Sequence, residues 1–94
     1  MKVIIEFGGG LELLFKNKKR YEENVPDELN MKGLIQWMSD NLLQERKELF
    51  IKSGSVTPGI LVLINDADWE LEGELEYQLV EGDTIVFIST LHGG

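Results

Sequence analysis

The residues best placed to do chemistry in this 94-residue chain stand at its end, in the segment Leu91-His92-Gly93-Gly94. They follow directly on an apolar run, Thr84 to Ile88, that predicts a β-strand. Because glycine has no Cβ, Gly93 and Gly94 can enter a narrow channel and adopt backbone conformations that other residues avoid. We therefore predict that the α-carboxyl group of Gly94 is presented to the active site of another protein.

The chain lacks the side chains that most alternative chemistries need. It has no cysteine and one histidine, His92, which excludes a disulfide scaffold, a thiolate nucleophile, and a cysteine- or histidine-rich metal site. Asp66 and Asp68 lack the glycine and glutamate spacing of a calcium loop. We expect no catalytic residue, no metal and no cofactor, so any sulfur chemistry would have to use the terminal carboxyl group.

His92 has two readings. It could assist proton transfer beside the reacting carboxyl group. We favour recognition of His92 by the partner, through its shape or hydrogen bonds, because no fixed carboxylate orients the imidazole.

The net charge of −8 is unevenly distributed. Residues 1–52 hold all nine Lys and Arg residues and nine acids, whereas residues 53–94 hold eight acids and no Lys or Arg. The common explanation for such an acidic half is a solvated surface that aids solubility. The same charge could also steer the tail towards a basic surface of a partner. Because phosphate contacts need clustered cations, direct binding to nucleic acid is disfavoured.

Apolar periodicity predicts a small set of elements. Strands are expected at Lys2 to Phe7, Leu11 to Phe15, Ile60 to Ile64 and Thr84 to Ile88, the first two joined by a glycine turn. Short extra pieces are expected as a strand at Trp69 to Leu71 and as helical turns within Gln44 to Phe50 and Glu74 to Val80, with Leu49 and Phe50 tucked under the domain.

One main helix is expected between the two pairs of strands. Asn30 is its predicted N-cap. A single apolar stripe follows at helical spacing, made of Met31, Leu34, Ile35, Met38 and Leu42. The ββαββ order predicts an α+β protein of the β-grasp architecture, with a mixed sheet packed on one main helix.

The chain divides into a globular domain at residues 1–88 and a C-terminal diglycine tail at residues 89–94. Its apolar stretches are too short to span a bilayer, and Glu6 interrupts any signal-peptide core. We expect a cytoplasmic protein, with the nucleus as a second compartment, and we expect no role at a membrane.

The strands carry more apolar residues than one sheet face can hold. With Val3, Ile5 and Phe7 towards the helix, alternation sends five aliphatic side chains to the opposite face: Ile4, Leu61, Leu63, Val86 and Ile88. We name these five residues the outer patch. An exposed apolar patch marks a partner site, whereas loops or a dimer contact covering it are the alternative.

The end of the chain resembles the ubiquitin-related modifier family of eukaryotes. The resemblance rests on NDADWEL and FISTLHGG within residues 60–94, and extends to EFGGG-x-ELLF at Glu6 to Phe15 and ERKELFI at Glu45 to Ile51. It covers essentially the whole chain and implies a β-grasp protein that is not an enzyme.

The resemblance also implies a reaction. An activating enzyme with adenylation and rhodanese domains uses ATP and a sulfur donor to convert the terminal carboxylate into a thiocarboxylate. The sulfur passes to the tRNA thiolation machinery for 2-thiolation of the wobble uridine, and the same activated end forms isopeptide bonds with lysines of target proteins. Here Gly94 is the modified residue, Gly93 its required neighbour, and Leu91 and His92 part of the recognised tail.

Two alternatives remain open. A sulfur carrier for molybdopterin or thiamine synthesis shares the fold, the diglycine end and the activation, although Ser89-Thr90-Leu91-His92 favours the modifier family. A non-catalytic β-grasp interaction domain with an incidental end would gain no mass when incubated with an activating enzyme.

Overall fold

The computed structural model describes residues 1–43 and 45–90. Its longer elements are β1 (Lys2–Gly8), β2 (Arg20–Asn24), α1 (Met31–Asn41), β5 (Ile60–Ile64) and β7 (Thr84–Ser89). Its shorter strands are β3 (Ile51–Lys52), β4 (Ser55–Val56) and β6 (Ala67–Asp68). Four 3₁₀ turns complete it: η1 (Leu11–Phe15), η2 (Lys47–Leu49), η3 (Trp69–Leu71) and η4 (Glu74–Glu76).

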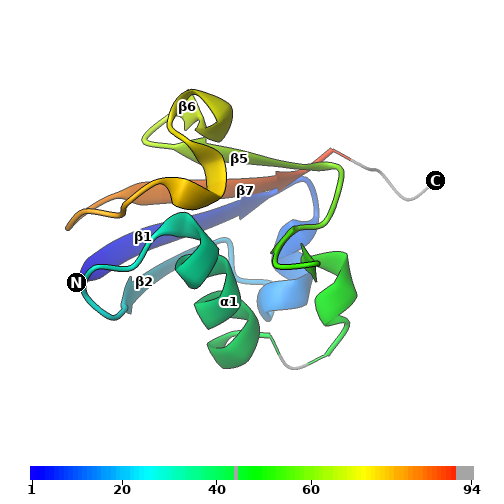
Figure 1. Cartoon of the computed structure of the whole chain (residues 1–94). Coiled ribbons are helices and arrows are strands. Elements are labelled where there is room, and N and C mark those ends of the chain that lie inside the picture. The colour runs from blue at the N-terminus through cyan, green and yellow to red at the C-terminus, as the bar shows by residue number, and fades with distance from the viewer. Residues whose placement is uncertain (44, 91–94) are drawn as a thin grey trace.

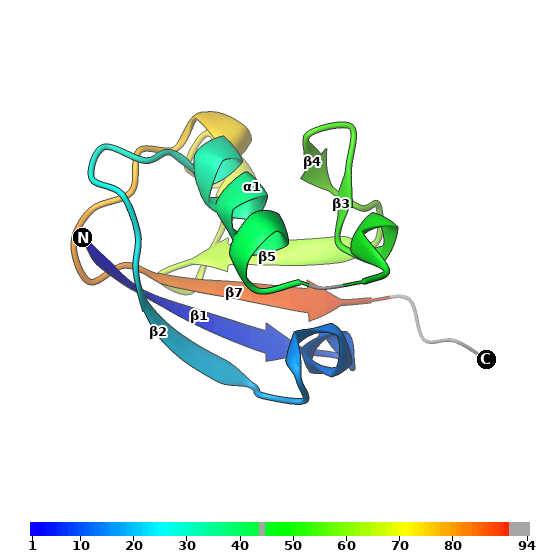
Figure 2. The same cartoon turned by 90° about the horizontal axis from the view of Figure 1, so that it is seen from below.

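A mixed five-stranded sheet lies behind one main helix. The strand order is β2-β1-β7-β5-β6, with β1 and β7 parallel and the other neighbouring pairs antiparallel. Helix α1 packs across one face of the sheet, and the small β3–β4 ribbon lies beside it (Figure 1, Figure 2). The predicted β-grasp architecture is confirmed.

The core forms between α1 and the inner face of the sheet. Strand alternation is as predicted, because the inward residues of β1, β5 and β7 are buried: Val3, Ile5, Phe7, Val62, Ile64, Ile85 and Phe87. The predicted helical stripe is buried at Met31, Leu34, Ile35 and Met38, and Leu42 packs on its edge. Asn30 caps α1 as predicted, since its Oδ1 accepts a hydrogen bond from Gly33 N at 2.9 Å.

The prediction of a second strand at Leu11 to Phe15 is wrong. Leu11 to Phe15 forms η1, and the strand that pairs with β1 is β2. Gly9 and Gly10 both have positive φ, which turns the chain out of the extended conformation. The helical turn then lets Leu11 and Phe15 enter the core together while Leu13 points outward.

Two smaller predictions are also wrong. Trp69 to Leu71 forms η3 rather than a strand, because the Asp68 carboxylate accepts a hydrogen bond from Glu70 N and starts a turn there. Leu49 does not tuck under the domain: it is 45% exposed, whereas the neighbouring Phe50 is fully buried. The predicted single helical turn within Glu74 to Val80 is confirmed as η4.

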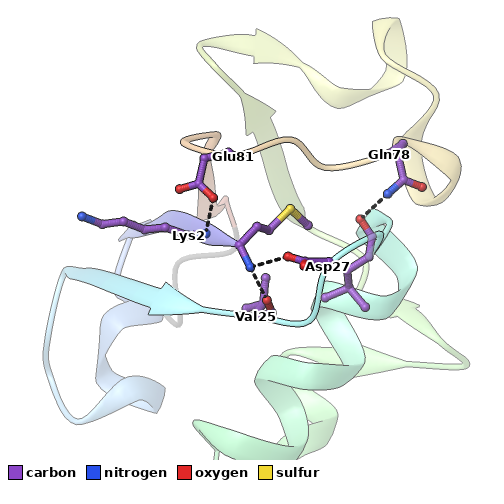
Figure 3. A network of polar contacts seen from close by, with 7 residues as sticks. Lys2, Val25, Asp27, Gln78 and Glu81 are labelled. Atoms are coloured by element: carbon purple, nitrogen blue, oxygen red, sulfur yellow. Dashed lines mark hydrogen bonds and ion pairs between the residues drawn. The ribbon is translucent and has the colours of Figure 1, made fainter.

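The start of the chain is tied down on two sides. The α-ammonium of Met1 donates to Val25 O at 2.7 Å and to Asp27 Oδ1 at 2.8 Å (Figure 3). Lys2 N donates to Glu81 Oε1 at 3.0 Å, and the ammonium lowers the pKa of Asp27 by hydrogen bonding and charge. These contacts fix β1 in register, and β1 is one of the two strands that flank β7.

A buried carboxylate fixes the start of β7. Asp83 Oδ2 accepts hydrogen bonds from the Tyr77 hydroxyl at 2.8 Å and from Val80 N at 2.9 Å. Asp83 Oδ1 accepts another from Asn65 Nδ2 at 2.9 Å. This network joins the β5–β6 turn to the loop that enters β7, so the start of the strand has a fixed position.

Stability should fall in alkaline solution through Tyr77. Burial, together with its hydrogen bond to Asp83, raises the pKa of Tyr77 from 10.0 to about 12. A raised folded-state pKa means that the neutral phenol stabilises the fold below about pH 10 and that this contribution is lost as pH rises towards about 12. The free energy of unfolding, measured with urea below about pH 10 and near pH 12, should fall less for Tyr77→Phe than for the parent protein. Equal losses would contradict the assignment.

Candidate functional site

The root of the tail is fixed where β7 leaves the sheet. β7 is a central strand, paired with β1 on one side and with β5 on the other. Directly after it, Thr90 N and Thr90 Oγ1 both donate to Gly59 O, at 2.8 and 2.6 Å. The two hydrogen bonds hold the last described residue against the start of β5.

Gly9 closes the other side of this exit. Its φ is 66°, and a Cβ built on it would lie 2.1 Å from Ser89 O. No side chain fits in that space, so glycine is required for the turn after β1 to pass beside the end of β7. We name Gly9, Gly59 and the backbone of residues 89–90 the tail-root clamp.

The four predicted tail residues, Leu91, His92, Gly93 and Gly94, lie outside the described residues. The described part of the exit extends beyond Ile88, since β7 includes Ser89 and Thr90 bonds to Gly59. Four residues beyond Thr90 can reach at most about 14 Å when extended. Any protein that acts on Gly94 must therefore approach the tail-root clamp closely.

The outer patch lies on the sheet face opposite α1, as alternation predicts. Leu61 pairs with Ile88, and Leu63 pairs with Val86, so four of its members form a block across β5 and β7. Leu61 is 36% exposed, and the other four members are half-buried. Ile4 lies on β1, opposite Thr84 of β7.

A charged cluster flanks the outer patch on β1 and β2. Arg20 lies 2.9 Å from Glu22 and 3.6 Å from Glu6, and Lys2 lies 3.3 Å from Glu22. The hydrogen bond from Arg20, with Lys2 second, lowers the pKa of Glu22. The outer face is therefore apolar over β5, β7 and Ile4 of β1, and ionic over β2 and the rest of β1, which suits a partner with an apolar centre and a polar rim.

Sequence reasoning did not find the tail-root clamp. The sequence predicts the triple glycine only as a turn, and the residues that hold the exit act mainly through backbone atoms. The available signal was Gly9, because a run of three glycines beside an expected strand end indicates a close backbone approach.

Residues 1–43 and 45–90 provide no group of three or more His, Cys, Asp or Glu side chains that could hold a metal ion. Over the same ranges, no helix has both the length and the apolar character needed to cross a bilayer.

Comparison with known proteins gives matches over nearly the whole chain. The family model described as Urm1 (Ubiquitin related modifier) matches residues 2–94. The Ubiquitin-related modifier 1 homolog of Dictyostelium discoideum is 60% identical over 96 residues, covering 100% of both chains. Ubiquitin-related modifier 1 of Homo sapiens is 56% identical over 97 residues, covering 100% of this chain and 96% of the human one.

Solved structures show the same fold. The solution structure of Urm1 from Trypanosoma brucei has a TM-score of 0.85 at 40% identity, covering 99% of this chain and 95% of that chain. A chain of the BexX/CysO complex of Amycolatopsis orientalis has a TM-score of 0.76 at 22% identity, covering 98% and 99%. The second likeness is one of fold alone.

Proposed function

This chain belongs to the ubiquitin-related modifier family, and we propose that the carboxyl group of Gly94 is adenylated and converted to a thiocarboxylate by a partner enzyme. The family consists of small ubiquitin-like modifiers and sulfur carriers, which are substrates and not enzymes. ATP and the sulfur donor are assigned to the partner, which combines adenylation and rhodanese domains.

One observation carries this proposal: a central strand of the sheet runs straight into the tail-root clamp, four residues before Gly94. A rigid body with a fixed exit presents the same short tail in the same direction each time the body is bound, which favours reaction by orientation. The family match up to residue 94 supports placing the reactive group at Gly94.

The chemistry needs no side chain of this chain. A carboxylate is a poor acyl donor, so one of its oxygens first attacks the α-phosphorus of ATP and pyrophosphate leaves. The outer sulfur of a persulfide on the partner then attacks the acyl carbon, AMP leaves with that oxygen, and an acyl disulfide forms. A thiol of the partner attacks the carrier sulfur of this disulfide, which leaves a disulfide on the partner and releases the thiocarboxylate. Sulfur replaces one oxygen, which explains how a chain without cysteine can carry it.

We further propose that the tRNA thiolation machinery receives the sulfur and uses it for 2-thiolation of the wobble uridine. We also propose that the activated end forms isopeptide bonds with lysines of target proteins. The net charge of −8 disfavours direct contact with the tRNA phosphates, so the sulfur passes through other proteins. We place the protein in the cytoplasm, with the nucleus as a second compartment. Carriers for molybdopterin or thiamine synthesis are the runner-up, and the family match favours the modifier reading.

Intact-mass spectrometry tests the proposal. The chain is incubated with its adenylating enzyme, ATP and a sulfur donor, and an oxygen-for-sulfur exchange should add about 16 Da. Omitting ATP is the control and should leave the mass unchanged. An unchanged mass with ATP present would refute the proposal and favour a plain interaction domain.

The outer patch is the proposed docking surface for the adenylating enzyme. Leu61→Asp places a charge in the exposed part of the patch, and we expect affinity to fall at least about tenfold because the buried carboxylate would lack a partner. Isothermal titration calorimetry measures the affinity. Val80→Asp, at a side chain that is 55% exposed and outside the patch, is the matched control. A Leu61→Asp chain that unfolds would instead place Leu61 in the core, and unaltered binding would exclude the patch.

A further inference from the structure

A second apolar surface lies at the exit of the tail. It is a groove of about 660 Å³, lined by residues of η1, of η2 and of the end of β7. Its main side chains are Leu13, Leu14, Arg46, Leu49 and Ile60, and we name it the tail-root groove. Gly9, Gly59 and Ser89 of the tail-root clamp also line it, so the groove and the exit share a wall.

Two of its leucines are exposed without serving the core. Leu13 on η1 is 70% exposed and Leu49 on η2 is 45% exposed, although they belong to segments far apart in the sequence. Leu14 and Ile60 are half-buried and pack against the core, which gives the groove an apolar floor. Exposed leucines gathered around an apolar floor mark a site for a partner.

The walls of the groove are held in place from inside. Phe15 ends η1 and Phe50 follows η2, and both are fully buried. Their rings contact each other edge to face at 5.3 Å, and Phe50 also contacts Phe87 of β7 at 5.3 Å. Because these rings fix both 3₁₀ turns to β7, the groove exists before a partner binds, and binding loses little conformational entropy.

The charge of the lining indicates the chemistry of the occupant. Within the described part of the chain, Arg46 is the one charged residue that lines the groove, and no ion pair involves it. The hydroxyl of Thr57, which also lines the groove, already donates to Glu48 O at 2.7 Å. An occupant therefore needs an apolar side chain for the floor and a carboxylate for the guanidinium of Arg46.

We propose that the tail-root groove receives a segment of the adenylating enzyme that carries a large apolar residue next to an acidic residue. This rests on the proposed function, because the enzyme that encloses Gly94 must reach the tail-root clamp. Strand alternation places Ile60 and Ser89 on the side opposite Leu61 and Ile88. The enzyme thus holds the exit from both sides, with the outer patch on one and the groove on the other.

The proposal is tested with two variants and their matched controls. Leu13→Ser combined with Leu49→Ser removes the apolar walls, and Leu71→Ser combined with Val80→Ser removes two exposed apolar side chains elsewhere, which are 79% and 55% exposed. Arg46→Gln removes the cation, and Lys32→Gln on exposed α1 surface is its control. Thermal unfolding monitored by circular dichroism confirms that each variant is folded.

Affinity for the adenylating enzyme is measured by calorimetry, and thiocarboxylation by intact mass. The double leucine variant should bind about tenfold more weakly, because a few large anchor residues supply most of the binding energy of an interface and this variant truncates two of them. Arg46→Gln should bind about threefold more weakly and should flatten the salt dependence of binding. Both controls should bind as the parent does, and saturating enzyme should restore thiocarboxylation of all variants.

Two outcomes would overturn the inference. If the parent gains sulfur and the double leucine variant binds with the affinity of the parent, the groove is not a docking site and the proposed function stands. A change confined to self-association in sedimentation would assign the groove to a second copy of the chain and would also overturn it. If the parent itself gains no mass, the proposed function and the inference fail together.

Discussion

Deleting Gly94 is expected to abolish thiocarboxylation while leaving the fold and enzyme binding intact. The tail-root clamp fixes Thr90, so the deletion shortens the maximum reach of the carboxylate by about 3.4 Å. A displacement of about 1 Å can already lower a rate about 100-fold, and this loss of reach is larger. Intact mass after incubation with the enzyme, ATP and a sulfur donor measures the loss, and wobble-uridine thiolation in cells measures its consequence.

The controls separate reach from recognition. The deletion variant should unfold at the same urea concentration as the parent and should bind the enzyme with an affinity within about threefold, because the outer patch and the tail-root groove are unchanged. Gly94→Ala keeps the length and adds one methyl group, so it tests the width of the channel. A deletion variant that gains about 16 Da at the parental rate would place the reactive group elsewhere.

The sequence was sufficient for the parts of the fold that follow a strong periodicity. α1 combines a stripe at helical spacing with an N-cap at Asn30, and β5 and β7 alternate over at least five residues. These signals come from burial of one face, so they also place the outer patch on the opposite face. Tertiary packing agrees with local preference in all of these segments.

The errors lie where local preference is ambiguous or weak. The run Leu11 to Phe15 is apolar and short, and such a run suits a strand as well as a helical turn. β2 reads RYEEN and is an edge strand with Tyr21 alone buried, so it carries no apolar alternation. Its position depends on the pairing with β1 and on the Tyr21 hydroxyl, which donates to Phe15 O at 2.5 Å.

The sequence predicts a chemistry for the candidate site but does not predict how the tail is held. A diglycine end without any cysteine predicts carboxyl chemistry, and this prediction rests on residue types alone. The tail-root clamp and the tail-root groove depend on contacts between residues more than thirty positions apart. Gly59 O and Thr90 N are 31 positions apart, and Gly9 and Ser89 are 80 positions apart. Backbone contacts of this kind leave almost no trace in side-chain pattern.

Replacing Gly9 by alanine should disturb the exit of the tail more than a methyl group added at any other position of the turn after β1. The added Cβ would lie 2.1 Å from Ser89 O, 3.0 Å from Ser89 C and 3.1 Å from Ser89 N. These are backbone atoms of a central strand, so they cannot rotate away as a side chain would. We expect the free energy of unfolding to fall by about 2–3 kcal/mol, from overpacking together with the positive φ.

Gly10→Ala is the matched control for this substitution. Gly10 also has a positive φ, 91°, but a Cβ there would meet nothing within 4 Å, so it carries the backbone penalty without the clash. The difference between the two variants in urea unfolding isolates the contact with Ser89, and we expect about 1–2 kcal/mol. Because the clash displaces the strand end that holds Thr90, Gly9→Ala should also slow thiocarboxylation about tenfold at saturating enzyme, through lost orientation of the tail. Equal stabilities and equal rates for the two alanine variants would show that the exit tolerates movement, and that orientation by the tail-root clamp contributes nothing to the reaction.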